Sequence, residues 1–248
     1  MSKLSTPVVV VTGAARGIGR AIATSFSQAG AAVVVTDVDL AAAQQTAMDL
    51  GGTTIAVHTD VTSLESVENM AAEVRKAFGR IDVLVNNAGW DKVSPFVDSA
   101  PKDWDTVMAI NLLGVLHTSK TVLPMMIEQG GGRVVNVASD AGRVGSSGEA
   151  VYSAAKGGVV AFSKSTAREM ARHGVTVNCV CPGPTDTALL ASIGGDDPKL
   201  RDALVKAIPL RRLAQPADIA NAVTFFAAEE SGYITGQTLS VSGGLTMS

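Results

Sequence analysis

The sequence predicts an α/β domain in which a doubly wound, parallel sheet of seven strands carries helices on both faces. The first observation behind this prediction is alternation, because short runs rich in β-branched residues are followed by longer segments of helical pattern along all 248 residues. The second is that runs such as 8–11 (VVVV) are continuously apolar. Strands of that kind are buried on both faces, as in a parallel sheet that helices cover.

The predicted elements follow one another in a regular order. The expected strands are residues 7–12, 32–36, 54–59, 81–86, 133–138, 175–181 and 237–241. The expected helices are residues 17–28, 40–50, 64–78, 104–129 and 150–172. Each helical pattern is long enough to carry the chain back across the sheet, so the next strand lies parallel to the one before.

The chain is expected to form a single dinucleotide-binding catalytic domain over residues 1–248. No Pro/Ser-rich linker, charge block or internal repeat divides it. The exception to the regular order is residues 184–209, a long insertion after the sixth strand that contains the breaker Gly-Gly-Asp-Asp-Pro. Long loops beyond the carboxyl ends of strands commonly serve as lids, so this segment is predicted to hold two short helices and to cover the substrate.

The composition excludes several classes of protein. Hydrophobic residues make up 46% of the chain and the net charge is −3, which excludes a disordered chain and gives no basic field for nucleic acid. No run approaches the roughly 18 apolar residues of a membrane span. Residues 1–6 lack the pattern of a signal peptide. We therefore expect a cytoplasmic protein that binds neither nucleic acid nor membrane.

The cysteines and histidines do not predict a metal site. Cys179 and Cys181 lie two apart in one apolar run, which suits neither a disulfide nor a metal and indicates two buried thiols. His58, His117 and His173 are scattered among unrelated elements. No bound metal is expected.

A glycine-rich turn lies between the first strand and the first helix. Residues 12–19 read TGAARGIG, with Gly13, Gly17 and Gly19 in the spacing G-x-x-x-G-x-G. Glycines let the backbone approach a pyrophosphate closely, and the helix N-terminus offers free N–H groups and the positive end of a dipole. This position between strand and helix predicts a dinucleotide site.

The choice of dinucleotide is expected to depend on Asp37, which ends the second strand 18 residues after Gly19. A carboxylate there would accept hydrogen bonds from the adenosine ribose and repel a 2′-phosphate, which favours NAD and makes NADP less likely. Arg16 argues the other way, because a guanidinium in the loop would grip a 2′-phosphate. The alternative role for Asp37 is a helix N-cap, for which Asp39 is an equal candidate.

A set of polar residues near the carboxyl ends of the strands predicts oxidoreductase chemistry. Tyr152 and Lys156 lie four apart in a helical pattern, so they share a face, and Ser139 follows the fifth strand. A phenol with a pKa near ~10 is a poor base, and a nearby ammonium is expected to lower that pKa. Tyr-x-x-x-Lys alone is as consistent with an ordinary helix pair, so the context decides.

With these motifs the chain resembles the short-chain dehydrogenase/reductase family over nearly its whole length. The matching motifs are TGAARGIG (12–19), Asp60-Val61, NNAG (86–89), Asn111 in INLLG, Ser139, YSAAK (152–156) and PGPTDT (182–187). The resemblance implies a Rossmann fold and a catalytic tetrad of Asn111, Ser139, Tyr152 and Lys156. It implies a cofactor site formed by Gly13, Arg16, Gly17, Ile18, Gly19, Asp37, Asp60, Val61, Asn87, Ala88, Gly89, Tyr152, Lys156, Pro182, Gly183, Thr185 and Thr187.

A finer resemblance suggests the substrate. Residues 139–156, 181–190 and 240–245 are similar to 2-hydroxycyclohexanecarboxyl-CoA dehydrogenases and, less closely, to 3-oxoacyl-acyl-carrier-protein reductases. The first group implies NAD-dependent oxidation of a β-hydroxyacyl-CoA to the β-ketoacyl-CoA, with Tyr152 taking the proton of the alcohol. The alternative is NADPH-dependent reduction of a 3-oxoacyl-acyl-carrier protein. A remote alternative is a binding protein that senses dinucleotides without chemistry.

Two further side chains are candidates for substrate contact beside Ser139 and Tyr152. Trp90 follows NNAG and is expected to form an apolar wall, although a Trp that packs in the core is an equal alternative. Arg143 lies four residues after Ser139 and is a candidate for CoA phosphates, with solvated surface charge as the alternative. The helices near 104–129 and 150–172 carry more apolar residues than one sheet-facing stripe needs, so we expect them to pair in a homotetramer.

Overall fold

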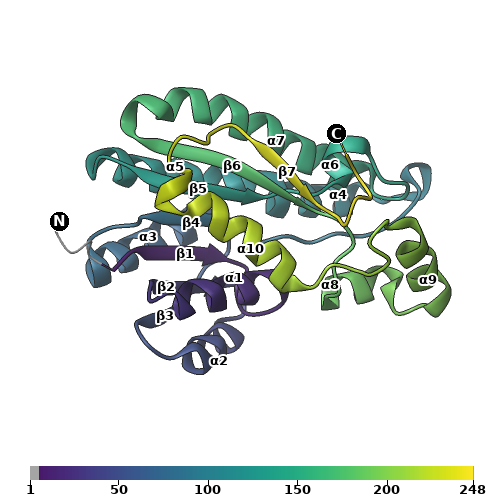
Figure 1. Cartoon of the computed structure of the whole chain (residues 1–248), viewed down its shortest axis with the longest axis horizontal. Coiled ribbons are helices and arrows are strands. Elements are labelled where there is room, and N and C mark those ends of the chain that lie inside the picture. Colours follow the sequence, from purple (N-terminus) through teal and green to yellow (C-terminus); the bar gives the residue numbers. More distant parts are fainter. Residues whose placement is uncertain (1–5, 248) are drawn as a thin grey trace.

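The computed structural model describes residues 6–247, so most of the N-terminal segment tested for a signal peptide lies outside the described residues. Its sheet consists of β1 (Val8–Thr12), β2 (Ala32–Asp37), β3 (Thr54–His58), β4 (Val83–Asn86), β5 (Gly132–Val137), β6 (Val175–Pro182) and β7 (Thr238–Val241). The strand order is β3-β2-β1-β4-β5-β6-β7 and every pairing is parallel. The predicted fold class is confirmed: a single Rossmann-like domain with a seven-stranded parallel sheet (Figure 1).

Helices connect the strands along both faces of this sheet. They are α1 (Gly17–Gln28), α2 (Leu40–Leu50), α3 (Leu64–Phe78), α4 (Pro101–Met108), α5 (Gly114–Glu128), α6 (Ala141–Val144), α7 (Ala150–Met170), α8 (Ala188–Leu190), α9 (Pro198–Ala207) and α10 (Pro216–Ala227). The helix expected over 104–129 begins at Pro101 and contains a π-helical turn over Ala109–Leu113. Helix α10 was not predicted from the sequence, although it begins with a proline at its first position and a capping box between Gln215 and Asp218.

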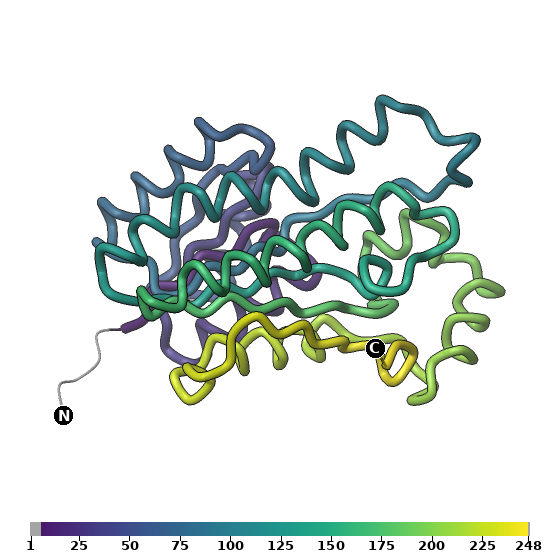
Figure 2. The backbone as a smooth tube through the Cα atoms, turned by 90° about the horizontal axis from the view of Figure 1, so that it is seen from above, coloured from purple at the N-terminus to yellow at the C-terminus, as the bar shows by residue number. Residues whose placement is uncertain are grey.

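Helices lie on both faces of the sheet (Figure 2), and two apolar layers hold them to it. On one face, α1, α2 and α10 pack through side chains such as Ile22, Ala43 and Ile219 against alternate residues of the strands. On the other face, α3, α5 and α7 pack against the remaining strand residues. Because neighbouring residues of a strand point to opposite faces, Val9 belongs to the first layer and Val10 to the second.

The order of the strands fixes the position of the site. The chain moves outward from β1 to β3 in one direction and from β4 to β7 in the other, so the direction reverses between β1 and β4. Loops that leave the carboxyl ends of neighbouring strands in opposite directions open a crevice at that point, where ligands bind in sheets of this type.

The insertion after β6 forms a small helical segment at the same end of the molecule. Within residues 184–209 lie α8, a π-helical turn over Ala191–Gly195, and α9. Arg201 on α9 donates to both carboxylate oxygens of Asp186, at 3.1 and 2.8 Å, which ties the segment to the loop after β6. Figure 2 shows this segment at the same end of the molecule as the loop before α4.

One continuous helical stretch, Pro101–Glu128, is long and apolar enough by length and composition to cross a membrane. A helix that packs in a protein core passes the same test. Val122, Met125 and Met126 of this stretch lie in the apolar layer against the sheet.

Candidate functional site

A large cavity of about 1540 Å³ lies at the carboxyl ends of the strands. Most of the residues predicted from the sequence line it: Gly13, Arg16, Gly17, Ile18, Gly19, Asp37, Asp60, Val61, Asn87, Ala88, Gly89, Trp90, Ser139, Tyr152, Lys156, Pro182, Gly183, Thr185 and Thr187. Small-molecule sites usually measure ~300–1,000 Å³, so this cavity is large enough for an extended ligand together with a second molecule.

The glycine turn brings the backbone close to one wall of the cavity. Gly13 has a φ of +62°, and a Cβ there would lie 2.8 Å from the Cα of Ala88. A Cβ on Gly19 would lie 2.3 Å from the carbonyl oxygen of Gly13. The Nδ2 of Asn87 donates to the carbonyl oxygens of Thr12 and Gly13, at 2.9 and 3.0 Å, which fixes the turn from the β4 side.

This turn fits the pyrophosphate of a dinucleotide. Helix α1 begins at Gly17, and its N-cap residue, Arg16, makes no side-chain capping hydrogen bond. The side chain of Arg16 therefore does not cap the first N–H groups of α1. At the glycine turn, these groups are suited to donate hydrogen bonds to an anion.

Asp37 holds the same turn from the β2 side. Its Oδ2 accepts a hydrogen bond from the N–H of Ala15, and its Oδ1 accepts one from the N–H of Asp39, both at 3.1 Å. Asp39 is the residue that caps α2, through a hydrogen bond from the N–H of Ala42. The carboxylate of Asp37 thus has a structural role in the loop in addition to its place on the cavity wall.

Local hydrogen bonds also hold the loops that follow β3 and β6, which border the cavity. At the β3 end, the Oδ1 of Asp60 accepts from the N–H and hydroxyl of Thr62, at 2.9 and 2.7 Å. At the β6 end, the hydroxyl of Thr185 donates to the carbonyl oxygen of Gly183 at 2.9 Å. Thr187 accepts from the N–H of Leu190 and so caps the short helix α8.

Ser139, Tyr152 and Lys156 come together between β5 and α7. The Ser139 hydroxyl forms a hydrogen bond with the Tyr152 side chain, which lowers the pKa of the phenol. The Nζ of Lys156 lies 5.7 Å from the centre of the Tyr152 ring and donates to the carbonyl oxygen of Val137 at 2.9 Å. Burial lowers the pKa of Lys156 to about 8, because an ammonium loses its hydration in the interior.

The expectation that Lys156 lowers the pKa of Tyr152 is not met in the structure. Burial is the largest influence on the phenol and raises its pKa, and the nearby carboxyl groups of Asp91 and Glu149 raise it further. The group that lowers the pKa of the phenol is the Ser139 hydroxyl, and Lys156 is not among the main influences on it.

Asn111 lies beside the cavity and not on its wall. It sits in the π-helical turn that interrupts the stretch from α4 to α5, a feature frequent at functional sites. Its side-chain amide bonds both the N–H and the carbonyl oxygen of Trp90. Asn111 is therefore joined to the cavity wall through the backbone of Trp90, the residue that follows Gly89.

The two candidates for substrate contact are placed differently. Trp90 lines the cavity, as an apolar wall would require. Arg143, on α6, instead donates to the hydroxyl of Ser240 on β7, which in turn donates to the carboxylate of Asp140. Arg143 is not among the residues that line the cavity, so its contact with the substrate stays a prediction.

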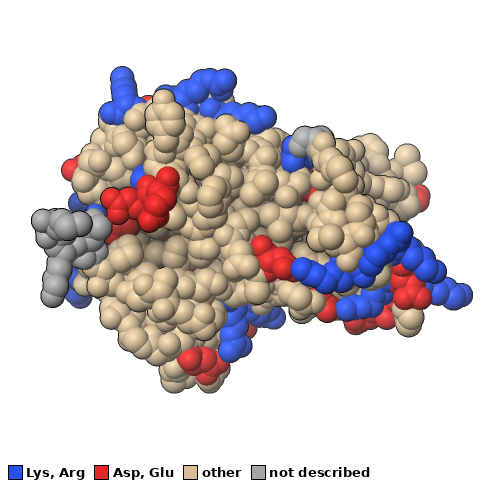
Figure 3. Space-filling view, viewed as in Figure 1, with Lys and Arg blue, Asp and Glu red and all other residues tan. Residues whose placement is uncertain are grey.

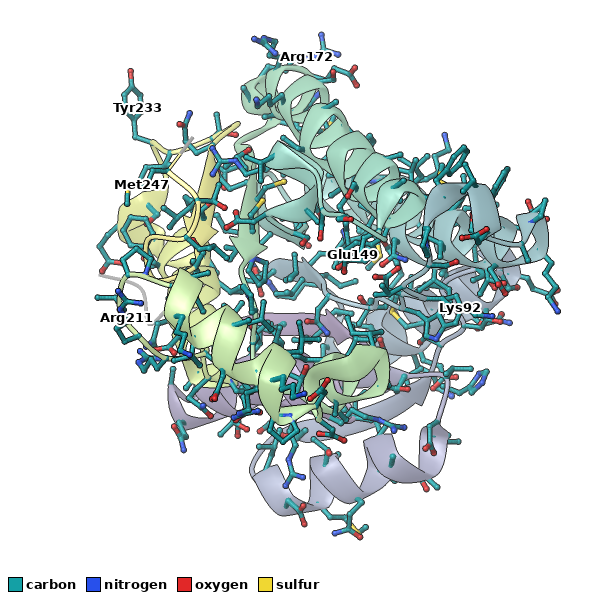
Figure 4. The ribbon with its side chains drawn as sticks, turned by 90° about the vertical axis from the view of Figure 1, so that its right-hand side faces the viewer. Lys92, Glu149, Arg172, Arg211, Tyr233 and Met247 are labelled. Carbon is teal, nitrogen blue, oxygen red and sulfur yellow. The ribbon has the colours of Figure 1, made fainter. Side chains whose placement is uncertain are left out.

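Two carboxyl groups at the site were not predicted. Asp91 follows Trp90, and Glu149 directly precedes α7, where it makes no side-chain capping hydrogen bond. Both line the large cavity together with Tyr152. Figure 4 shows Glu149 in the middle of this end of the molecule, with Lys92 to one side of it. The sequence could have indicated Asp91, because this acidic residue directly follows Trp90 in the loop after β4.

Within residues 6–247, no group of three or more His, Cys, Asp or Glu side chains is placed so that it could hold a metal ion.

Comparison with known proteins places these features in a family. Residues 13–246 match the family model described as enoyl-(acyl carrier protein) reductase. A 3-oxoacyl-[acyl-carrier-protein] reductase of Vibrio cholerae is 40% identical over 244 residues, covering 98% of this chain and 99% of the relative. Proteins of the same name from Escherichia coli and Synechocystis are each 39% identical, over 97% and 100% of this chain and of the relative respectively.

These relatives correct the prediction that NAD is the cofactor and NADP the less likely one. They are 3-oxoacyl-[acyl-carrier-protein] reductases, which use NADPH. The prediction relied on a free Asp37 carboxylate, whereas both of its oxygens accept backbone hydrogen bonds within the loop. Arg16, which favours a 2′-phosphate, stands at the same cavity with its side chain 67% exposed.

The relatives also bear on the finer resemblance. All three are named 3-oxoacyl-[acyl-carrier-protein] reductase, which agrees with the resemblance that the sequence showed less closely. They give no support to the resemblance to 2-hydroxycyclohexanecarboxyl-CoA dehydrogenases. The family match over 13–246 and the relatives at 39–40% identity settle the broader assignment. The chain belongs to the short-chain dehydrogenase/reductase family and is an NAD(P)-dependent oxidoreductase that acts on CH–OH and ketone groups.

Proposed function

We propose that this protein reduces the ketone of a 3-oxoacyl thioester on an acyl carrier protein, with NADPH as the cofactor. The observation that carries the proposal is that Ser139, Tyr152 and Lys156 line the same cavity as the glycine turn. A protonated phenol beside a hydroxyl is the arrangement that donates a proton to a ketone oxygen. The names of the relatives at 39–40% identity favour the same substrate.

The residues around the glycine turn would hold the cofactor. Gly13, Arg16, Gly17, Ile18 and Gly19 would bind the pyrophosphate, and Arg16 would also bind the 2′-phosphate. Asp60 and Val61 would bind the adenine, and Asp37 the adenosine ribose. Pro182, Gly183, Thr185 and Thr187 would bind the nicotinamide, and Asn87, Ala88 and Gly89 would support the cofactor. When bound, NADPH supplies the hydride that the ketone carbon accepts.

Side chains of the protein orient and protonate the ketone oxygen of the substrate. Ser139 orients the ketone oxygen and stabilises the negative charge that develops on it. Tyr152 donates its proton to that oxygen. Lys156 holds the nicotinamide ribose, and its burial keeps it in one position on the α7 face. Asn111 fixes the backbone of Trp90, and Trp90 forms an apolar wall for the acyl chain. The segment 184–209 closes over the bound molecules.

A substrate and cofactor panel tests the proposal. The purified protein is mixed with NADPH or NADH and with the same 3-oxoacyl group on acyl carrier protein or on CoA, and loss of the reduced nicotinamide is followed. We expect the highest kcat/KM with NADPH and the acyl carrier protein. A higher kcat/KM with the CoA ester contradicts the assigned carrier. A higher value with NADH contradicts the cofactor, and no turnover of any thioester contradicts the whole proposal.

We propose that the protein works in the cytoplasm as a homotetramer. The face formed by α10 and β7 carries few charges (Figure 3). Large apolar side chains are exposed along it, among them Phe225, Leu239 and Met247. The sequence predicts a second apolar surface on the helices α5 and α7. Two distinct interfaces on one chain build a closed tetramer. Sedimentation velocity is expected to give a tetramer, and a monomer would contradict the proposal.

A further inference from the structure

Ser139 is the first residue of a tight turn that leads into α6. Within this turn, the N–H of Gly142 donates to the carbonyl oxygen of Ser139, and the N–H of Val144 donates to the carbonyl oxygen of Asp140, both at 3.0 Å. The N–H of Ala141 donates to the Ser139 hydroxyl at 3.1 Å. The direction of that hydroxyl therefore depends on the position of the whole turn.

The backbone of the turn rests directly against α7. A Cβ on Gly142 would lie 2.6 Å from the backbone nitrogen of Gly157 and 2.6 Å from the carbonyl carbon of Lys156. No side chain fits between the two backbones at that distance. Because α7 also carries Tyr152, the seat of the turn on α7 determines where Ser139 lies relative to Tyr152 and Lys156.

Side chains tie the same turn to β7, the strand at the edge of the sheet. The guanidinium of Arg143 donates to the hydroxyl of Ser240, and that hydroxyl donates to Oδ1 of Asp140. One hydroxyl thus joins two oppositely charged side chains of the turn. Asp140 is 5% exposed, and within residues 6–247 its Oδ2 has no hydrogen-bond partner. The bond from Ser240 is therefore the side-chain hydrogen bond that compensates this buried carboxylate.

Ser240 lies behind the wall of the large cavity. Asp140 lines that cavity beside Ser139, whereas Arg143 and Ser240 are not among the lining residues. In the sheet, Ser240 is paired with Cys181 of β6, so main-chain hydrogen bonds between the strands hold it in place. Ser240 is thus a fixed point of the sheet to which the turn is attached.

We propose that Ser240 is a positioning residue that keeps the Ser139 hydroxyl directed at the ketone oxygen. It acts through Asp140 and Arg143 and touches neither substrate nor cofactor. The inference deepens the proposed function and relies on it for the role of Ser139. A displaced hydroxyl stabilises the negative charge of the transition state less well, so loss of Ser240 should slow the reaction and leave cofactor binding intact.

Ser240→Ala removes both hydrogen bonds of the cluster. A misplacement of ~1 Å can lower a rate up to ~10²-fold, so we expect kcat for the 3-oxoacyl thioester to fall by about tenfold. KM for NADPH should be nearly constant, because Asn87 and Asp37 hold the glycine turn. Ser240→Thr keeps the hydroxyl and should restore most of kcat. Thr238→Val is the matched control, since it removes from the same face of β7 a hydroxyl that has no hydrogen-bond partner.

A double-mutant cycle separates positioning from a general loss of stability. In a Ser139→Ala background the hydroxyl to be positioned is gone, so Ser240→Ala should have no further effect on the residual kcat. A general weakening of the fold would lower kcat by the same factor in both backgrounds. Equal factors would therefore overturn the inference.

Hydrogen exchange tests the attachment of the turn without substrate. The amides of residues 141, 142 and 144 form hydrogen bonds within the turn, and in Ser240→Ala they should exchange several-fold faster than in the parent. Ser240→Thr and Thr238→Val should leave their exchange unchanged. If Ser240→Ala does not fold, Ser240→Cys takes its place, because a thiol keeps the volume and is only a weak donor.

The two measurements fail in different ways. Equal exchange at the turn in the parent and in Ser240→Ala would overturn the inference, even if the activity changes. Faster exchange at the turn, together with no reduction of any thioester in the substrate panel, would overturn the proposed function and support the attachment of the turn to Ser240.

Discussion

The side-chain amide of Asn111 holds the peptide of Trp90 from both sides. Its Nδ2 donates to the carbonyl oxygen of Trp90 at 2.6 Å, and its Oδ1 accepts from the N–H of Trp90 at 3.3 Å. Nδ2 also donates to the carbonyl oxygen of Val107 at 2.9 Å. One fully buried amide therefore links the turn between α4 and α5 to the loop that follows β4.

Replacing Asn111 with Leu should destabilise the protein because partners of the amide are left without hydrogen bonds. The cost is expected to be about 1–3 kcal/mol for an unsatisfied buried group. Urea denaturation of the parent and the variant measures it. Asn111→Asp retains an acceptor for the N–H of Trp90 but places negative charge at its carbonyl oxygen, so it should also be less stable than the parent. Equal free energies of unfolding for Asn111→Leu and the parent would contradict this role.

Tyr152→Phe should abolish reduction while preserving the cofactor site. The phenol is the proposed proton donor, and loss of a general acid typically lowers the rate ~10²–10⁴-fold. NADPH binding, measured by fluorescence or calorimetry, should change little. Tyr233→Phe removes the other phenol, at a fully exposed position, and is expected to keep full activity. Substantial turnover by Tyr152→Phe would refute the proposed mechanism.

Arg143→Ala should weaken the fold more than it weakens substrate binding. The guanidinium is connected through Ser240 to the carboxylate of Asp140, which is 5% exposed. Removing the guanidinium breaks its hydrogen bond to Ser240 and leaves that hydroxyl without the donor, which costs about 1–3 kcal/mol. Thermal unfolding should show a clearly lower Tm, and KM for the thioester should be nearly constant. Arg143→Ala combined with Asp140→Asn should recover part of the Tm, which a direct contact with substrate would not produce.

Lys156 should give the stability of the protein a characteristic pH dependence. Its pKa in the folded state is about 8, below the value of 10.5 for a free lysine. Between these values the unfolded chain binds more protons than the folded one, so the free energy of unfolding rises as the pH increases through that window. Below it, burial of the ammonium costs on the order of 3 kcal/mol.

Lys156→Met should remove this rise, which denaturation at several pH values between about 7 and about 10 will reveal. The carbonyl oxygen of Val137 loses its donor in the variant, but that loss does not depend on pH. Lys164→Met is the control, because Lys164 is an exposed lysine on the same helix. The prediction is wrong if parent and Lys156→Met show the same slope.

Arg16→Ala should raise KM for NADPH by about tenfold, the effect of losing one charge-assisted contact of ~1.5 kcal/mol. Arg16 lines the cavity, and its partner in the structure is Asp39 at 3.2 Å. Arg20→Ala is a matched control, since Arg20 forms a similar exposed pair with Asp49 at 2.9 Å. A similar rise of KM in both variants would indicate general electrostatics and not a phosphate contact.

The sequence was informative where function depends on local order along the chain. The glycine turn from Gly13 to Gly19 joins β1 to α1, and Tyr152 and Lys156 share a face because they are four apart on one helix. The strands were recognisable because burial on both faces leaves a continuous apolar run, as in β1. Each of these features depends only on residues that are close together in the sequence.

Features that depend on contacts between distant residues were not predictable in the same way. The direction of Arg143 is set by Ser240, 97 residues further along the chain. That Asp91 and Glu149 line one cavity with Tyr152 depends on how the β4 loop and α7 are placed in the fold, and burial there is the main cause of the raised pKa of Tyr152. Asp37 looked like a free ribose ligand because its hydrogen bonds to the backbone of Ala15 and Asp39 appear only in the folded loop.

The two thiols in β6 have a practical consequence. Cys179 and Cys181 are the only cysteines of the chain, both are 0% exposed, and burial raises both pKa values far above neutrality. The thiolate is the reactive form, so neither should react with maleimides while the protein is folded. A cysteine introduced on α9 would therefore be labelled alone in the otherwise unmodified protein. A fluorophore there would test the prediction that the segment closes over the cavity during turnover.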